Sequence, residues 1–384
     1  GWDIRHALMA NYAVFLAMVA SLIFLCRPLL KGFPPYPLFF VPFFSDYVWI
    51  NMGWSFQSQF HFMILFALCA IWFGLARPPT ARNTAGFIFF CGLSMFSMSP
   101  TCALGVWCVY ALKQFSQMTR ENWTRRATTL AAAMGGIAAL TLAFFSGYRG
   151  IHLAGEPGFY LLYPWNGRFW SYSCRSLANA FAGTGYDCAP WLGFFVAPAA
   201  GLLVLYILAK SKLRNESVFP PLAIVAASLV SLAAIAYGRV YMERMACDRH
   251  MEVLLMAIPA LMAVWATLPK ERIGRGGLLA ALLILLKGYS WYLVPREAPI
   301  MQDYLLAGKG EIVAYAKGYK SQVDSELLYP TNLTAHVLRA EELGLSFTRE
   351  IPTANWSNRR SEAGRTNVAL KMNSEAPDAP PPPF

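Results

Sequence analysis

Long apolar stretches, each about as long as a membrane span, dominate the pattern of hydrophobic and polar positions. An α-helix needs about 20 mostly apolar residues to cross the hydrocarbon core of a bilayer. We therefore predict about seven full spans. The stretches are Met9–Cys26, Phe60–Ala76, Ala127–Phe145, Trp191–Ala209, Phe219–Gly238, Met251–Leu268 and Gly277–Val294.

An eighth apolar region, Gly86–Leu112, is interrupted in its middle by Ser97–Thr101, which contains Pro100. A proline lacks the backbone N–H that a continuous helix needs and clashes with the preceding turn. The region is therefore predicted to form two short helices that meet near Pro100 as a broken V rather than one span. The predicted fold class is an all-α, polytopic helical membrane protein.

The composition agrees with this class, since 57% of the residues are hydrophobic, only 14% are charged, and the mean hydropathy is +0.40. The net charge of +11 would suit nucleic acid, but the basic residues cluster in short connections between apolar stretches. Such clusters are typical of cytoplasmic loops, so we expect no nucleic-acid partner. The clusters are Arg77 and Arg82; Lys113, Arg120, Arg125 and Arg126; Lys210, Lys212 and Arg214; and Lys270, Arg272 and Arg275.

Placing these clusters in the cytoplasm predicts the topology of the other connections. Residues 27–59, 146–190 and 239–250 become outer loops, and the amino terminus with Arg5 lies inside. The segment between Arg82 and Lys113 must then go out and come back, as a broken V would do.

Three domains follow from the fall in hydropathy after Val294. Residues 1–294 are predicted to be the transmembrane domain. Residues 295–354 are predicted to be a small helical extracytoplasmic domain, with helices at Gln302–Tyr319 and Asn332–Leu343. Residues 355–384 are polar and end in a proline run, which is typical of a disordered tail.

Two cysteines, Cys174 and Cys188, fall in the long outer loop, where an oxidising compartment would permit a disulfide between them. Their geometry cannot be read from the sequence, so both the bonded and the free state stay open. No ligand set for a divalent metal is visible among the cysteines and histidines, and the identity of any cofactor is unknown.

The same long loop carries many aromatic residues with arginines between them, among them Trp165 and Arg168. Such residues can form an interfacial belt at a membrane face. They can also form a surface for sugar rings and phosphates, because arginine pairs with phosphate. Gln57 and Gln59 precede an apolar span, and we expect one of them to hydrogen-bond a ligand or a loop there and the other to be an interface residue.

The connection 239–250 is the most highly charged one between two apolar stretches, with arginines that include Arg239 and Arg249. Arginines at bilayer depth suit an anionic headgroup such as a lipid phosphate. The alternative is a set of interfacial anchors, in which Arg244 pairs internally with Asp248.

The order of these features resembles bacterial multi-pass proteins of the GT-C glycosyltransferase superfamily over most of residues 1–350. The resemblance rests on a series of motifs: Trp54–Phe60 before a span, the serine-rich break Ser94–Thr101, Gly238-Arg239, Asp248-Arg249-His250, Leu327–Pro330 and Leu343–Ser346. His250 stands where these proteins usually have tyrosine. Gly1–Arg5 is similar to the start of the family's third span, so we expect the first two spans and their acidic outer loop to be missing from the chain.

The resemblance implies a membrane glycosyltransferase-like protein that acts on polyprenyl-phosphate-linked sugars at the outer face of the cytoplasmic (inner) membrane. Arg239 and Arg249 would bind the phosphate of the lipid carrier, and Asp46 would replace the missing catalytic acid as the base. The alternative is a non-catalytic membrane protein: a lipid-linked glycan transporter, an assembly subunit or a truncated relic of such an enzyme. The sugar, the acceptor, any protein partner and the oligomeric state are not specified by the sequence.

Overall fold

The regular elements of the protein are helices throughout the part that the structure describes. A computed structural model describes residues 4–31, 40, 58–147, 163–182, 216–239, 250–267, 310–317, 319 and 334–342. The named helices are α1 (Ile4–Leu30), α3 (Ser58–Leu75), α4 (Ala81–Ser97), α5 (Thr101–Ser116), α6 (Trp123–Gly147), α7 (Gly167–Ala182), the 3₁₀ turn η5 (Glu216–Val218), α9 (Phe219–Arg239), α10 (Met251–Leu255), α11 (Ala257–Trp265) and α13 (Thr334–Glu342). No strand occurs in these ranges, which confirms the all-α class.

The chain divides into two compact units, which are described separately. One unit is Leu8–Leu293, a helical bundle, and the other combines Gly1–Ala7 with Val294–Phe384. The division lies beside the boundary that the fall in hydropathy placed after residue 294. In the second unit, residues 310–317 are helical and α13 carries an exposed i, i+3 ion pair between Arg339 and Glu342 at 2.7 Å.

Four of the described helices are long and apolar enough to cross a membrane, which indicates a membrane protein. They are His6–Leu30, Ser58–Leu75, Trp123–Gly147 and Glu216–Gly238. Each coincides with a stretch predicted from hydropathy. The predicted spans Trp191–Ala209 and Gly277–Val294 lie outside the described residues. Within the described part of the chain four spans are supported, and the predicted number of about seven is not confirmed.

The remaining predicted span, Met251–Leu268, is a shorter apolar helical segment, Met251–Trp265, made of α10 and α11. Met256, between them, keeps helical backbone angles. Pro259 lies in the first turn of α11 and has no N–H to donate to the carbonyl of Leu255. The two helices together reach only Trp265, which is shorter than a full span.

The break predicted near Pro100 is confirmed, because α4 ends at Ser97 and α5 begins at Thr101. The start of α4 and the end of α5, the two ends away from the break, lie at the same end of the bundle. Lys113, in the last turn of α5, donates from Nζ to the carbonyl of Leu75 at 2.7 Å, and Arg125 at the start of α6 donates to the carbonyl of Pro79 at 3.0 Å. The chain between Arg82 and Lys113 therefore goes out and comes back, while the side of the membrane on which it starts stays a prediction.

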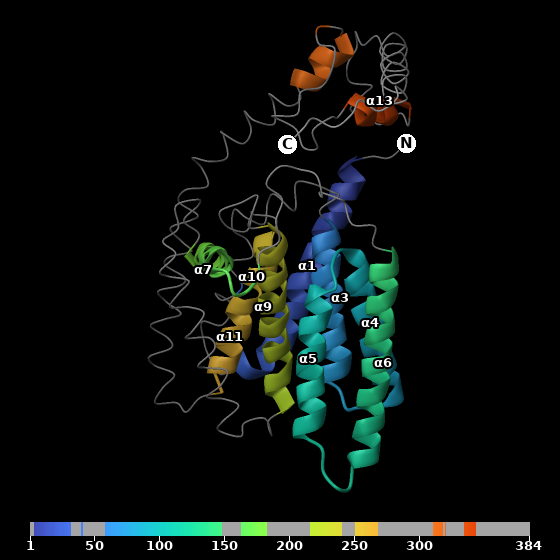
Figure 1. Ribbon diagram of the computed structural model, residues 1–384, viewed down its shortest axis with the longest axis vertical. Helices are drawn as coiled ribbons and strands as arrows, with labels where there is room; N and C mark the ends of the chain where they lie inside the picture. Colours follow the sequence, from blue (N-terminus) through green and yellow to red (C-terminus); the bar gives the residue numbers. More distant parts are fainter. Residues whose placement is uncertain are drawn as a thin grey trace, which may run out of the picture. The chain divides into compact units, whose positions relative to one another are not determined.

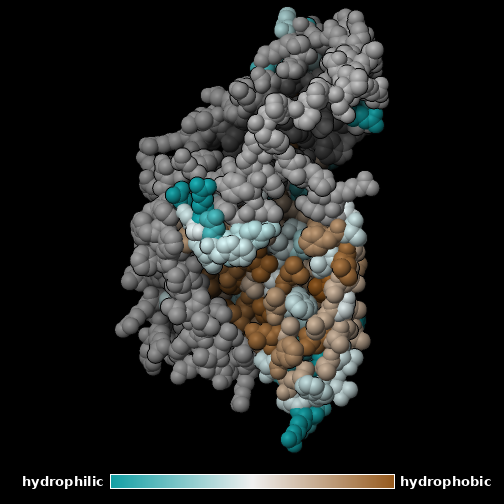
Figure 2. Space-filling model, in the orientation of Figure 1, coloured by the Kyte–Doolittle hydropathy of each residue, from teal (hydrophilic) through white to brown (hydrophobic). Residues whose placement is uncertain are grey.

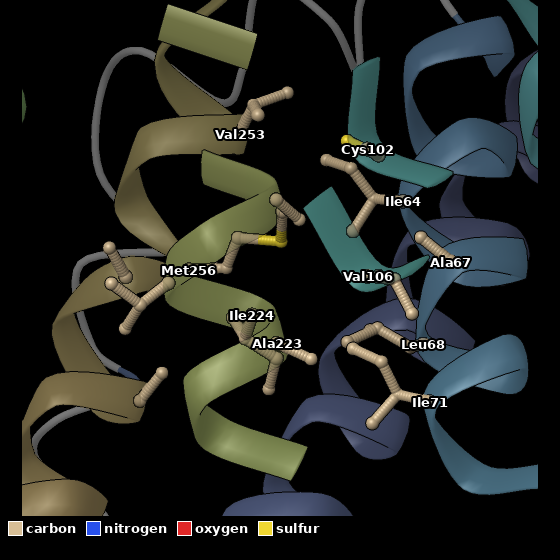
Figure 3. Packing of buried hydrophobic residues seen from close by; sticks show 14 of the residues in the cluster. Ile64, Ala67, Leu68, Ile71, Cys102, Val106, Ala223, Ile224, Val253 and Met256 are labelled. Carbon is tan, nitrogen blue, oxygen red and sulfur yellow. The ribbon is translucent and has the colours of Figure 1, made fainter. Parts of the chain in front are cut away.

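The core of the bundle draws on residues of α1, α3, α4, α5, α9, α10 and α11, and Figure 3 shows part of it. Ile64, Leu68 and Ile71 of α3 lie toward Val106 of α5 in this view, and Ala223, Ile224 and Met256 fill the neighbouring layer. The closest approach is between α5 and α9, since a Cβ on Gly105 would lie 2.6 Å from backbone atoms of Ala227. Only glycine permits this contact, which packs the two backbones directly against each other.

The direction of α1 differs from the predicted topology. Asn11 and Phe15 contact His61 near the start of α3, and Phe24 contacts Trp72 near its end, with ring centroids 4.7 Å apart. Contacts that advance together along both helices show that α1 and α3 run parallel (Figure 1). An outer loop at 27–59 that simply joins two antiparallel spans is therefore wrong, because Leu30 and Ser58 lie at opposite ends of the bundle.

The two ends of the bundle differ in charge. We call the end where α3 and α5 finish the basic end, and the end where they begin the α7 end. Figure 2 shows hydrophobic residues over the middle of the bundle and hydrophilic residues at the tip of the basic end, where Arg120 and Glu121 are exposed. The parallel direction of α1 brings Arg27 and Lys31 to the basic end as well. By the positive-inside tendency, this end is the one expected in the cytoplasm.

Candidate functional site: the α7 end of the bundle

Helix α7 lies across the direction of the bundle and packs against α9 and α10 (Figure 1). Most of its described side chains from Tyr172 to Ala180 are buried, whereas Trp170 in its first turn is 53% exposed. An amphipathic helix in this orientation is typical of a helix that lies in the membrane interface. Through its contacts with α9 and α10, α7 covers the end of the bundle where α9 finishes and α10 begins.

A tight turn before α7 presents two aromatic rings to the solvent. The rings of Tyr163 and Trp165 are stacked, with centroids 4.5 Å apart and planes inclined by only 3°, and Trp165 is 81% exposed. Hydrogen bonds fix the turn: the Asn166 amide donates to the carbonyl of Tyr163 at 2.9 Å, and Trp170 Nε1 donates to the carbonyl of Pro164 at 2.6 Å. The stacked pair is thus held in place without a ligand.

The turn also contacts the end of α9. The ring of Tyr163 meets that of Tyr237 edge-on at 5.4 Å, and Tyr237 lies two residues before Arg239, the last residue of α9. The structure therefore brings Trp165, from the predicted long loop, to the helix end that carries Arg239. Arg168, at the start of α7, is exposed at the same end of the bundle.

The other predicted site residues are only partly placed. Gln59 is exposed in the first turn of α3, at the α7 end. Gln57, Asp46, Arg249 and Cys188 lie outside the described residues.

Of the two cysteines of the possible disulfide, only Cys174 lies within the described residues. Cys174 is a buried free thiol in α7, and burial raises the pKa of this thiol. A raised pKa keeps the sulfur protonated at neutral pH, which makes it a poor nucleophile. Within the described ranges, no three His, Cys, Asp or Glu side chains come together as a metal site.

Beneath α7, three polar side chains meet inside the apolar bundle. Nδ1 of His61 lies 2.6 Å from Oδ1 of Asn11, and Nε2 of His61 lies 3.0 Å from both carboxylate oxygens of Glu252. All three residues are buried, with exposures of 1% or less. We call them the Asn11–His61–Glu252 cluster. It joins α1, α3 and α10, three segments that are far apart in the sequence.

The donor and acceptor roles within the cluster depend on the tautomer of His61 and on the orientation of the Asn11 amide. Nδ1 of His61 pairs with the Asn11 amide, and Nε2 pairs with the Glu252 carboxyl group, as donor or as acceptor. In each arrangement both ring nitrogens of this buried histidine have a polar partner.

Reasoning from the sequence missed this cluster. Asn11, His61 and Glu252 each lie within three residues of the start of a predicted apolar span, and polar residues inside spans are functional candidates. That signal was available. With α1 predicted to run in the opposite direction, however, Asn11 was expected at the other end of the bundle from His61.

No family model, curated protein or solved structure matches the chain. The geometry at the α7 end and the chemistry of its residues are therefore the basis for a functional proposal.

Proposed function

We propose that the protein is glycosyltransferase-like and acts on polyprenyl-phosphate-linked sugars, with the α7 end at the outer face of the cytoplasmic membrane. The observation that carries this proposal is the stacked Tyr163–Trp165 pair at the end of α9 that bears Arg239. An exposed, immobilised indole offers a flat apolar face, and the apolar face of a sugar ring can stack on it.

Arginine supplies the second part of the recognition. A guanidinium binds phosphate through two parallel hydrogen bonds and stays charged close to a membrane. Arg168 at the start of α7 and Arg239 at the end of α9 come from the two elements that the aromatic turn joins. A sugar on the aromatic pair and its phosphate toward an arginine would match a lipid-linked sugar donor.

The amphipathic α7 supports the same assignment, because a lipid-linked donor reaches an enzyme from the plane of the bilayer. If α7 lies in the interface, its packing on α9 and α10 would put the aromatic turn at headgroup depth. Asp46 and Arg249 stay the proposed base and second phosphate ligand.

Binding measurements in nanodiscs test the proposal. We expect Trp165→Ala to weaken binding of a polyprenyl-phosphate hexose about 3- to 10-fold, equivalent to ~0.5–1.5 kcal/mol of lost aromatic stacking. The same change should leave binding of unglycosylated polyprenyl phosphate nearly unaltered. Arg239→Ala should weaken both ligands, since both carry the phosphate.

Trp123→Ala is the matched control, because Trp123 is also well exposed, at 60%, but lies at the basic end of the bundle. If Trp165→Ala binds both lipids like the wild type, the aromatic turn is an interfacial anchor and the sugar proposal is wrong. Binding of the hexose lipid without transfer to any acceptor would favour the non-catalytic alternative, a transporter or assembly subunit.

A further inference from the structure

The basic end of the bundle carries a strongly charged surface that the proposed function does not use. Two connections form it, residues 76–80 between α3 and α4 and residues 117–122 between α5 and α6, together with the first turns of α4 and α6. Five arginines in these segments accompany a single acid, Glu121. We call these five residues the arginine surface: Arg77, Arg82, Arg120, Arg125 and Arg126.

The fold concentrates this charge by bringing the two connections together. Nε of Arg125, in the first turn of α6, donates to the carbonyl of Pro79 at 3.0 Å, although the two residues are 46 positions apart in the sequence. Helix α6 also packs along α4. Figure 2 shows the hydrophilic tip of this end, below the hydrophobic middle of the bundle. Arginines from two separate loops therefore contribute to one surface.

No acid of the chain neutralises these arginines within the described residues. The ion pairs described there involve other residues. Arg125 donates to a backbone carbonyl, and Arg126 donates to the amide oxygen of Gln114 at 3.0 Å, so both have neutral acceptors. Arg82 and Arg120 are exposed, and their guanidinium groups make no hydrogen bond to the described part of the chain. Their donors are thus available to an anionic oxygen from another molecule.

Two tryptophans indicate where this surface lies relative to a bilayer. The guanidinium group of Arg77 lies 4.3 Å from the ring centroid of Trp72, in the last turn of α3. Trp123, the first residue of α6, is 60% exposed. Both helices are apolar and long enough to span a membrane, and tryptophan is enriched where spans meet the interface. The anions nearest to the arginines are therefore the phosphates of lipid headgroups.

The uncompensated charge also selects the kind of lipid. Phosphatidylglycerol has a net negative charge, whereas the phosphate of phosphatidylcholine is neutralised by its own choline group. A basic segment close to a membrane gains attraction for each arginine only if the surface is anionic. A cluster of basic residues beside the ends of spans is typical of a site for anionic headgroups.

We propose that the arginine surface binds anionic phospholipids, with the guanidinium groups of Arg82 and Arg120 on headgroup phosphates and Trp123 in the interface. The surface lies at the opposite end of the bundle from α7. Its role does not depend on the proposed function, because neither the aromatic turn nor Arg239 takes part.

Lipid titration of the full-length protein in detergent, followed by native mass spectrometry, tests this proposal. The two probes are phosphatidylglycerol and phosphatidylcholine with the same acyl chains. We expect the wild type to bind phosphatidylglycerol about tenfold more tightly at low salt. Added salt should reduce this preference, since it screens exposed charges.

Removal of two exposed arginines should remove most of the preference. Arg82→Gln combined with Arg120→Gln is expected to weaken binding of phosphatidylglycerol about tenfold and to leave phosphatidylcholine unaltered, because each arginine contributes roughly a threefold to fivefold attraction. Arg82→Lys combined with Arg120→Lys should keep most of the affinity, because both positive charges remain.

Lys317→Gln combined with Arg339→Gln is the matched control, because it removes the same charge from the other compact unit. Lys317 is exposed, and Arg339 already pairs with Glu342. This variant should bind phosphatidylglycerol like the wild type. Equal weakening in both glutamine variants would mean that the net charge of the protein decides, and it would overturn the proposal.

Two further results would also overturn it. One is an unchanged affinity for phosphatidylglycerol in the variant with Arg82→Gln and Arg120→Gln. The other is a wild type that binds both lipids equally well. An acidic protein segment would then be the anionic partner that the arginine surface fits.

Discussion

The two ends of the bundle each bury a charged side chain, and they do so in opposite ways. At the basic end, Lys113 is fully buried and donates to the carbonyl of Leu75 at the end of α3, while the exposed carboxylate of Glu216 lies 3.4 Å from its Nζ. At the α7 end, Glu252 is buried together with Asn11 and His61. Its partner in the described contacts, His61, is buried as well.

The partners explain the difference. Lys113 satisfies a backbone carbonyl that α3 leaves open at its end, so it closes a helix terminus near the solvent. In the Asn11–His61–Glu252 cluster the described hydrogen bonds link side chains to one another, and they join three segments from distant parts of the sequence. A buried charge of the first kind serves local structure, whereas one of the second kind defines the tertiary arrangement.

Removal of the carboxylate at the α7 end should have the largest effect on stability. Glu252→Ala is expected to lower the free energy of unfolding by about 3–5 kcal/mol, since His61 loses its buried partner. Glu252→Gln should cost much less. Unfolding in detergent by increasing SDS would measure both variants, and equal losses would show that the charge of Glu252, and not the hydrogen bond alone, carries the stabilisation.

At the basic end, Lys113→Met should have a smaller effect, about 1.5–3 kcal/mol, the range for a hydrogen bond to a charged group. The methionine fills the space of the lysine stem but leaves the Leu75 carbonyl without this donor. Glu216→Gln is the companion variant and should change little, because the carboxylate is 60% exposed. A loss for Lys113→Met as large as that for Glu252→Ala would contradict the comparison.

The helix cap of α4, a local contact at the basic end, should contribute less to the free energy of unfolding than Lys113 does. Thr80 caps α4 by accepting from the amide of Asn83 at 3.2 Å, so Thr80→Ala should cost about 1 kcal/mol. Thr128→Ala serves as the control, because Thr128 lies exposed in the interior of α6 and donates only to the carbonyl of Thr124. Alanine is the better helix former there, so this change should be neutral or slightly stabilising.

The smallest effect on stability is expected for the exposed aromatic ring at the α7 end. Trp165→Ala should change the free energy of unfolding by less than about 0.5 kcal/mol, as should Trp123→Ala at the basic end. A similar unfolding curve combined with weaker binding of the sugar lipid would separate recognition from stability. If Trp165→Ala instead lowers the free energy of unfolding by much more than this, the aromatic turn contributes to the stability of the core.

The hydropathy of the sequence by itself determined the helices that are long enough to span a bilayer and the break before α5. Four predicted spans appear as helices because an apolar stretch of that length can satisfy its backbone only internally. The break falls between Ser97 and Thr101 because Pro100 has no backbone donor. These are local properties, and the residues that cause them lie within the segment concerned.

The structure alone decided the direction of α1 and, with it, the existence of the Asn11–His61–Glu252 cluster. Hydropathy is the same whichever way a span runs, and the positive-inside tendency gave the opposite direction, because Arg5 and Arg27 flank the two ends of α1 and both are basic. Side-chain packing resolved it: Phe15 contacts His61 and Phe24 contacts Trp72 only if the helices run parallel. Contacts between segments depend on the whole fold, so a buried histidine and carboxylate 191 positions apart become a pair only in the tertiary structure.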